Sequence, residues 1–130
     1  MTLAPDATVK DLFLQACDRN ELNKVRYSLG LGANVNWQRD RDRYSGLFFA
    51  AGRNYGELLE LLLSQPGVDV NITTNNNNVT PLMVACSWNH KNENITRRLC
   101  QVNGIDPNIR NVKGQTALHY AVWNNKPRCV

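Results

Sequence analysis

Small apolar residues recur along this 130-residue chain at a nearly constant spacing. Successive pairs that contain alanine are separated by 34, 35 and 36 residues: Ala16-Cys17, Ala50-Ala51, Ala85-Cys86 and Ala121-Val122. A leucine stands three residues before the alanine in the last three of these pairs, at Leu47, Leu82 and Leu118. Self-similarity at this period is typical of repeat proteins, in which each repeat is one supersecondary unit. The pattern therefore predicts four consecutive units.

The polar and apolar positions within a unit predict two short helices followed by an extended loop. The first helix is expected to begin at a hydroxyl side chain that accepts a hydrogen bond from a first-turn amide, at Ser45, Thr80 or Thr116. The second is clearest in the leucine-rich segment 58–63, which suits a helix buried between neighbours. A glycine that adopts positive φ is expected to end the second helix, at Gly32, Gly67 and Gly104.

Composition changes this picture little. Hydrophobic residues make up 42% of the chain, which is enough for the core of one domain. The 15 Lys and Arg residues exceed the 11 Asp and Glu residues by four, but they are spread from Lys10 to Arg128. Nucleic-acid binding is disfavoured, because a basic patch must be clustered to attract a phosphate backbone. No apolar run approaches the roughly 18 residues that span a bilayer, so no membrane partner is expected.

The residues that could carry catalysis or hold a metal do not form a recognised motif. A zinc site built on Cys86 and His90, with Cys100 or His119, is disfavoured because Cys86 stands at a repeat position that suits a small buried residue. The four cysteines are expected to be reduced, which favours an intracellular protein of the cytoplasm or nucleus. Nucleophile elbows, phosphate loops and paired carboxylates are absent, so we expect no enzyme, no cofactor and no small-molecule substrate.

Three segments carry a resemblance to a known family. Thr-Pro-Leu-Met-Val-Ala-Cys at 80–86 and Thr-Ala-Leu-His-Tyr-Ala-Val at 116–122 resemble the first helix of ankyrin repeats, and Gly-Val-Asp-Val-Asn at 67–71 resembles their loop. The resemblance implies an all-α repeat solenoid of stacked helix-turn-helix units with β-hairpin loops. It divides one domain, 1–130, into repeats at about 5–36, 37–71, 72–108 and 109–130. The last is partial, so we expect a fragment of a longer array.

Two departures from the family pattern concern the hairpins. Arg43 and Asn78 stand where the family usually has a glycine. Asparagine tolerates positive φ better than arginine, so the hairpin that contains Arg43 is expected to be remodelled. His119 occupies the histidine position of the helix motif, and the resemblance implies that its imidazole forms a hydrogen bond with neighbouring backbone.

The resemblance also implies that the partner is another protein or peptide, bound on the concave groove and the hairpin tips. The positions that it selects are Arg41, Asp42, Tyr44, Arg53, Asn76, Asn77, Trp88, Lys113 and Trp123. Trp, Tyr and Arg dominate interface hot spots, so Tyr44, Arg53, Trp88 and Trp123 are predicted to form one binding strip. As an alternative to binding, Trp88 packs on the turn beside it. For Trp123 the alternative is that its side chain is exposed only because the fourth repeat is partial. Trp37 and Tyr55 are expected to be packing residues.

Two other functions stay open at this point. Loop asparagines of ankyrin proteins can be hydroxylated, and Asn71, with Leu63 eight residues before it, is similar to the sequences that such enzymes select. The chain would then be a regulatory substrate of an asparaginyl hydroxylase. Weak nucleic-acid binding is the second alternative, and a steep loss of affinity with salt would identify it.

Overall fold

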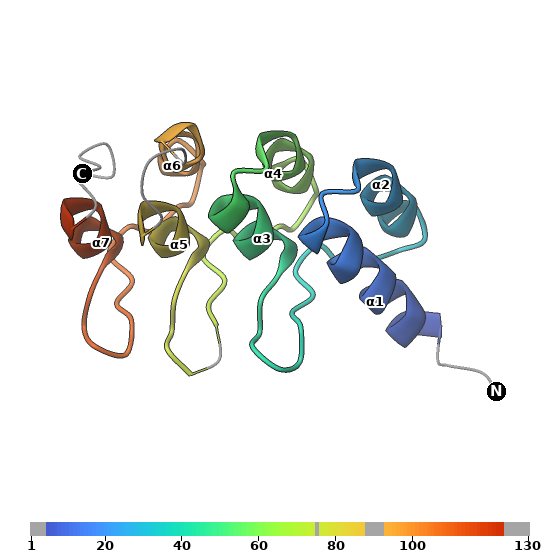
Figure 1. The fold of residues 1–130 in the computed structure, drawn as a ribbon, viewed down its shortest axis with the longest axis horizontal. Helices are drawn as coiled ribbons and strands as arrows, with labels where there is room; N and C mark the ends of the chain where they lie inside the picture. Colours follow the sequence, from blue (N-terminus) through green and yellow to red (C-terminus); the bar gives the residue numbers. More distant parts are fainter. Residues whose placement is uncertain (1–4, 75, 88–92, 124–130) are drawn as a thin grey trace.

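The computed structural model describes residues 5–74, 76–87 and 93–123. Within these ranges the chain forms seven α-helices (Figure 1). Their bounds are Pro5–Asp18 for α1, Leu22–Gly30 for α2, Gly46–Arg53 for α3, Gly56–Leu63 for α4, Pro81–Ser87 for α5, Glu93–Cys100 for α6 and Ala117–Trp123 for α7. None of these helices is long and apolar enough to cross a membrane.

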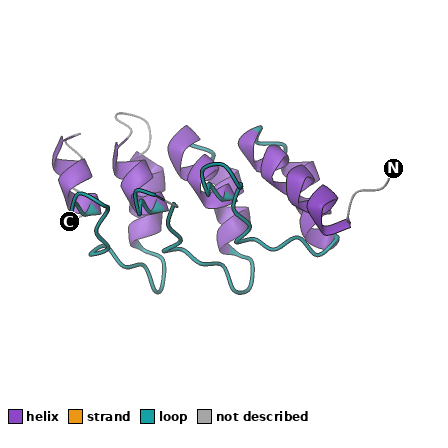
Figure 2. Ribbon diagram, turned by 90° about the horizontal axis from the view of Figure 1, so that it is seen from below, coloured by secondary structure: helices purple, strands orange, loops and turns teal. Residues whose placement is uncertain are grey.

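The helices form two parallel rows. Helices α1, α3, α5 and α7 make the first row, and α2, α4 and α6 make the second row above it (Figure 1). Helices α1, α3 and α5 each pack on the second-row helix of their own layer and on the next first-row helix, and α7 packs on α5. The long loops extend away from the first row and run along one edge of the stack when it is seen from below (Figure 2). This arrangement is the all-α repeat solenoid that the sequence predicts.

Three loops project below the first row, and we name them fingers 1, 2 and 3 (residues 38–45, 73–80 and 109–116). Within the described ranges they contain no β-strand, and one isolated antiparallel bridge joins Gln38 to Ser45. The expected β-hairpins are therefore reduced to turns. A backbone hydrogen bond joins the two arms of each turn, for example the bond from Thr74 N to Val79 O at 2.9 Å. Arg43 and Asn78 adopt φ of 63° and 55°, so the arginine takes the same left-handed conformation as the asparagine and the turn at Arg43 is not remodelled at this residue.

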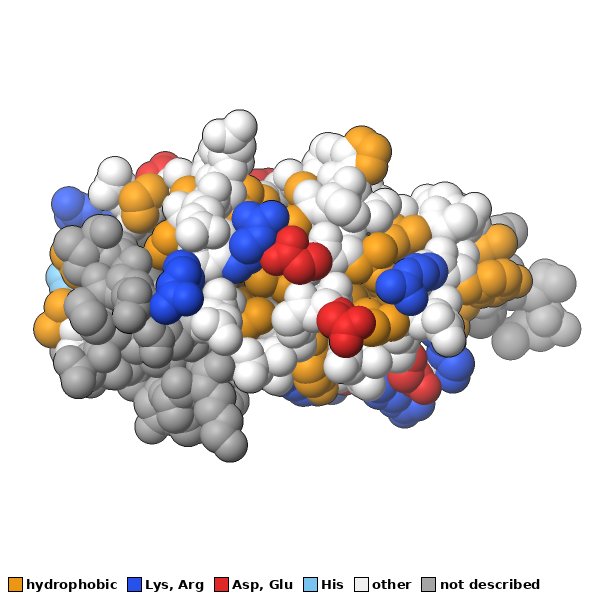
Figure 3. Space-filling model, turned by 90° about the horizontal axis from the view of Figure 1, so that it is seen from above, with side chains coloured by type: hydrophobic (Ala, Val, Ile, Leu, Met, Phe, Trp, Pro, Cys, Tyr) orange, Lys and Arg blue, Asp and Glu red, His pale blue; other side chains and the backbone are white. Residues whose placement is uncertain are grey.

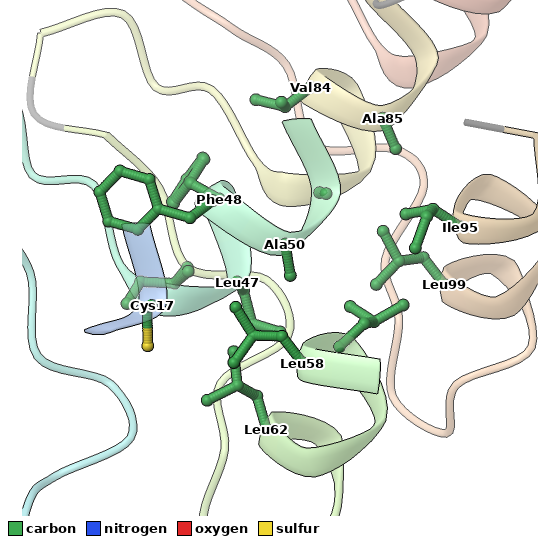
Figure 4. Close-up of a cluster of buried hydrophobic side chains, with 14 of the residues drawn as sticks. Cys17, Leu47, Phe48, Ala50, Leu58, Leu62, Val84, Ala85, Ile95 and Leu99 are labelled. Carbon is green, nitrogen blue, oxygen red and sulfur yellow. The ribbon is translucent and has the colours of Figure 1, made fainter. Parts of the chain in front are cut away.

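The core lies between the two rows, where small residues of the first row meet large residues of the second. Figure 4 shows Leu58 of α4 below Ala50 of α3, and all four of Leu58, Ala50, Ala85 and Leu99 are fully buried. The closest approach is at Gly46, where an added Cβ would lie 3.0 Å from Cys17 Sγ and 3.1 Å from Leu62 Cδ1. Three helices meet there, so a side chain at Gly46 would force them apart.

The predicted side-chain cap is confirmed at Thr80 and wrong at Ser45, and at Thr116 the hydroxyl contacts His119 Nδ1 rather than a first-turn amide. Thr80 Oγ1 accepts a hydrogen bond from Met83 N at 3.2 Å, as expected of an N-terminal cap. Thr116 N donates to His119 Nδ1 at 3.0 Å, which confirms the predicted contact between this imidazole and the backbone. The prediction is wrong at Ser45, because its Oγ is buried without a hydrogen-bond partner. Gly32, Gly67 and Gly104 adopt the predicted positive φ. Because α4 ends at Leu63 and α6 at Cys100, however, Gly67 and Gly104 lie four residues beyond the helices rather than at their ends.

A ladder of asparagine side chains joins the loops that follow the second-row helices. Asn36 donates from Nδ2 to Gly67 O at 2.9 Å and accepts at Oδ1 from Asp69 N at 2.7 Å. Asn71 repeats both bonds one layer later, to Gly104 O and from Asp106 N, each at 2.8 Å. One carboxamide thus satisfies a donor and an acceptor of the next loop. The ladder fixes the distance between layers on this edge.

Replacing Asn71 by alanine removes both bonds to the next layer, and we expect a loss of roughly 1 to 2 kcal/mol in the free energy of unfolding. The matched control is Asn108→Ala, because Asn108 occupies the same position in its loop, is exposed, and makes no side-chain hydrogen bond to any described residue. Urea denaturation followed by circular dichroism measures both variants. Equal losses for the two variants would contradict a bridging role for Asn71.

The cysteines differ from the expectation at one position. Cys17 and Cys100 have free thiols, whereas Cys86 is disulfide-bonded, so the prediction of a reduced thiol is wrong there. Cys86 is fully buried. Its distance along the sequence from the other cysteines does not indicate that it forms a disulfide. Burial raises the pKa of the Cys17 thiol to about 12, and the negative charge of Asp18 is a second, smaller cause. Burial also raises the pKa of the half-buried Cys100 thiol.

In the native protein at pH 8, iodoacetamide is expected to modify Cys100 and to leave Cys17 unmodified. The thiolate is the reactive form, and Cys17 has neither the exposure nor the pKa to provide it. Peptide mapping by mass spectrometry after a timed reaction measures both sites. Denaturation in urea before alkylation is the control and should make the two rates alike. Equal rates in the native protein would contradict the buried position of Cys17.

Candidate functional site

A groove of about 290 Å³ lies on the lower side of the first row, between the helices and the fingers. Its lining comes from α3, α5 and α7 and from fingers 1 and 2. The lining residues are Arg39, Tyr44, Phe48, Phe49, Gly52, Arg53, Val79, Met83, Val84, Ser87 and Tyr120. Three consecutive layers therefore contribute to one surface.

Aromatic rings covered by guanidinium groups form one end of the groove. The Phe49 ring lies between Arg39, whose Cζ is 5.0 Å from the ring centroid, and Arg53, whose Cζ is 5.5 Å away. The Tyr44 ring stacks on Phe48 with centroids 5.2 Å apart, and Arg39 Cζ lies 5.8 Å from the Tyr44 ring as well. Both guanidinium groups are within the range of cation–π attraction.

Carboxylates hold both arginines in these positions. Arg39 donates from Nε and Nη2 to the two oxygens of Asp42, at 3.1 and 2.6 Å, and this pair leaves three of its five N–H groups unused by Asp42. Arg53 Nη1 donates to the Asp18 carboxylate and to Asp18 O, the latter at 2.8 Å. The hydrogen bond from Arg39 lowers the pKa of Asp42 and raises that of Arg39. The side chains are thus ordered before any partner arrives.

Two further hollows lie between the fingers, and we name them hollow A and hollow B. Hollow A, about 300 Å³, separates fingers 1 and 2, and hollow B, about 350 Å³, separates fingers 2 and 3. Asn77 and Val79 of finger 2 line both. Val79 also lines the groove, so all three spaces have this residue in their walls.

The structure brings most of the predicted binding residues together on these surfaces. Tyr44 and Arg53 line the groove. The residues of hollow A include Arg41, Asp42, Tyr44, Asn76 and Asn77, and those of hollow B include Asn77 and Lys113. Trp88 lies outside the described residues. Trp123 ends α7, and the orientation of its side chain is not described. The predicted strip is therefore supported at Tyr44 and Arg53 alone.

Sequence analysis did not select most of the groove residues, and Arg39, Phe49 and Tyr120 are three examples. Arg39 precedes the expected hairpin tip, Phe49 belongs to a helix expected to be core, and Tyr120 lies in the histidine-containing motif. The signal that could have found Arg39 is its spacing from Asp42, since oppositely charged residues three apart in a tight turn can pair. Trp37 and Tyr55 pack against the core as predicted, with the Trp37 ring edge-on to Phe13 at 6.4 Å.

The opposite face has a different character. Figure 3 looks onto the second row and shows Lys and Arg side chains interspersed with Asp and Glu. One such pair joins Arg98 Nε of α6 to Glu60 Oε2 of α4 at 2.7 Å.

In the described part of the chain, no three His, Cys, Asp or Glu residues are grouped so that they could hold a metal ion. The groove and the finger hollows are thus the candidate site.

Comparison with known proteins agrees with this architecture. A family model described as ankyrin repeats (3 copies) matches residues 12–111 and 47–130. An ankyrin repeat protein of fowlpox virus (strain NVSL) is 35% identical over 129 residues, which cover 96% of this chain and 36% of that protein. An E3 ubiquitin-protein ligase of Arabidopsis thaliana, XBAT33, is 39% identical over 88 residues, 66% of this chain and 16% of the ligase. A human cation channel, transient receptor potential subfamily A member 1, is 26% identical over 115 residues, 88% of this chain and 10% of the channel. The chain spans little more than a third of the first of these relatives and less of the others.

Replacing Asp42 by asparagine removes the bidentate partner of Arg39, and we expect a loss of up to about 1 kcal/mol in stability at pH 7. The pKa of Asp42 is lowered in the folded protein, so its contribution is complete above the unfolded-state pKa near 3.8 and disappears as pH falls through the lower folded value. The stability difference between the two proteins should therefore stay constant from pH 7 to 5 and shrink below about pH 4. Urea denaturation at each pH measures it, and a difference that is unchanged at pH 3 would contradict the assignment.

Proposed function

Since this chain belongs to the ankyrin repeat family, whose repeats are generally protein–protein interaction modules, we propose that it binds a peptide or folded protein on the groove and the adjoining finger hollows. The whole protein's activity and partners are part of the same proposal, because the matched relatives are much longer. The family is typically non-enzymatic, and we propose no catalytic role, cofactor or small-molecule substrate for this chain.

The observation that carries the proposal is the ordered arginine–aromatic cluster at one end of the groove. Tyr and Arg are the residue types that most often dominate binding energy, and they do so where neighbouring groups fix them in place. Arg39 and Arg53 are fixed by carboxylates and by the Phe49 ring. Such fixed side chains lose little conformational freedom when a partner binds, which supports affinity at this position. Trp88 and Trp123 stay in the proposal as further contacts.

The first alternative, hydroxylation of Asn71, is less well supported. Its carboxamide is engaged in two hydrogen bonds to the next loop, so an enzyme would have to open the ladder to reach it. A mass increase of one oxygen on Asn71 in protein from cells with active hydroxylase would favour this alternative.

The free thiols of Cys17 and Cys100 support a cytoplasmic or nuclear location, whereas the Cys86 disulfide does not.

Photo-crosslinking tests the groove directly. A benzophenone amino acid replaces Tyr44 in the groove or, as the matched control, Tyr27, which is 63% exposed on α2. After illumination in a lysate of the source cells, we expect a discrete crosslinked protein with the probe at Tyr44 and none at Tyr27. Excess unlabelled chain should prevent the crosslink.

A second variant tests the predicted strip. The double substitution Trp88→Ala/Trp123→Ala, with its helical circular dichroism unchanged, should weaken crosslinking from Tyr44 at least about threefold if the tryptophans are contacts. The same protein crosslinked equally from Tyr44 and Tyr27 would contradict a binding groove. An intact crosslink in the double variant would remove the tryptophans from the site and leave the groove.

A further inference from the structure

The loop that follows α6 contains the one asparagine of the chain that directly precedes a glycine, at Asn103-Gly104. The fold requires the glycine, because φ of Gly104 is 85° and the equivalent Gly32 and Gly67 of the two preceding loops also have positive φ. The residue before the glycine is leucine in one of these loops and proline in the other. The fold therefore accounts for Gly104 and does not account for Asn103.

The side chain of Asn103 is exposed and makes no hydrogen bond to a described residue. Other asparagines of the chain are engaged: Asn36, Asn71 and Asn111 each make at least two side-chain hydrogen bonds. The carboxamide of Asn103 can therefore turn toward its own main chain without losing a contact.

Asn103 and Gly104 are the two central residues of a turn that is closed by a hydrogen bond from Ile105 N to Val102 O, 3.2 Å. The peptide group between them makes no hydrogen bond to a described residue, either at Gly104 N or at Asn103 O. Type I and type II turns differ by a rotation of this central peptide, and glycine at the second position accepts both. Apart from its neighbours in the chain, no described atom lies within 4 Å of a Cβ added at Gly104. The peptide thus has the room and the freedom to rotate.

We propose that Asn103 is a deamidation site, at which the backbone nitrogen of Gly104 attacks Cγ of the Asn103 side chain. The new bond from Gly104 N to Cγ closes a succinimide ring, the bond from Cγ to Nδ2 breaks, and the amide proton of Gly104 leaves with Nδ2 as ammonia. Water then adds to one of the two ring carbonyls and opens the ring. Opening at the side-chain carbonyl gives aspartate. Opening at the main-chain carbonyl gives isoaspartate, in which the main chain runs through Cγ and is one methylene longer.

Glycine is the residue that least hinders this attack, because no side chain shields its nitrogen. The chain contains its own comparison in Asn108, which is exposed and makes no side-chain hydrogen bond to a described residue. Asn108 is followed by Ile109, whose branched side chain lies beside the nitrogen that would attack. The two asparagines therefore differ mainly in the residue that follows them.

The modified loop is also the loop that Asn71 holds. Gly104 O accepts a hydrogen bond from Asn71 Nδ2, and Asp106 N donates one to Asn71 Oδ1, each at 2.8 Å. A methylene inserted between Asn103 Cα and Gly104 N displaces both groups relative to the carboxamide that binds them. Conversely, the two bonds restrain the rotation that the attack requires. Deamidation and the asparagine ladder thus oppose each other.

The inference does not depend on the proposed function. The residues that line the groove and hollows A and B lie outside the segment 101–108. A chain deamidated at Asn103 therefore keeps the side chains of the candidate site, and the change acts on the contact between two layers.

Incubation of the full chain at pH 8 in water labelled with a heavy oxygen isotope, followed by peptide mass spectrometry, measures the reaction at each asparagine. We expect Asn103 to convert at least tenfold faster than Asn108 in the same molecules, and each product to contain one heavy oxygen. The rate at Asn103 should fall at least tenfold at pH 6, because the attacking nitrogen must lose its proton. Asn71→Ala should raise the rate at Asn103 at least twofold and leave the rate at Asn108 unchanged. Asn103→Gln is the control and should give no product at this position.

Urea denaturation then tests the effect on the ladder. The isoaspartyl form, separated by chromatography, is compared with the variant Asn103→Asp, which has the same mass and charge and lacks only the extra methylene in the main chain. The isoaspartyl form should unfold at a lower urea concentration than Asn103→Asp. Asn71→Ala should remove this difference, because the two ladder bonds are then already absent.

Three results would overturn the inference. Equal conversion of Asn103 and Asn108 in the native chain would contradict the deamidation site. An unchanged rate at Asn103 in Asn71→Ala would contradict the restraint by the ladder, and equal urea midpoints of the isoaspartyl form and Asn103→Asp would contradict its opening.

Discussion

Burial of the helix pairs depends on contact between successive layers. The first-row helices contribute small side chains such as Ala50 and Ala85, and the second-row helices contribute larger ones such as Leu58 and Leu99. A pair of helices with so few large apolar residues cannot enclose a core by itself, so each layer is completed by its neighbours. Leu47 and Leu82 illustrate this dependence: both are almost fully buried, whereas Leu118, at the same position of α7, is 42% exposed. No described helix follows α7 to cover it.

Stacking on one side of the molecule leaves the loops on the other side to be positioned by polar groups. The fingers have too few backbone hydrogen bonds to form strands, and they are held by side chains such as Gln38 and Asn78 that reach the next finger. The helices thus provide the floor of the groove, while amide side chains determine the spacing of the finger hollows. The fingers therefore contain both the side chains that hold them in place and the side chains that line the hollows.

The repeat could be predicted from the sequence because it depends on local rules. Alanine spacing, the positive φ of the glycines after the second helices and the left-handed Asn78 each follow from one residue and its local preference, whereas the left-handed Arg43 does not. The details of the site depend on contacts between distant residues and could not be predicted in this way. Arg53 was selected as a binding residue, but its contact with Asp18, 35 residues earlier, is a property of stacking. Ser45 has the right residue type for a cap, yet its hydroxyl is buried without a partner.

The asparagine ladder also determines how the chain should respond to mechanical load. Asn36 and Asn71 each connect one loop to the next through two hydrogen bonds, and among the described residues no single bond extends across more than two layers. A pulling force along the stack is therefore carried in series by the junctions between successive layers, in which these bonds act together with the packing of neighbouring helices. The weakest junction opens first and lengthens the chain by one layer, while the remaining layers keep their structure. Extension should therefore proceed in steps, each of which unfolds about one repeat.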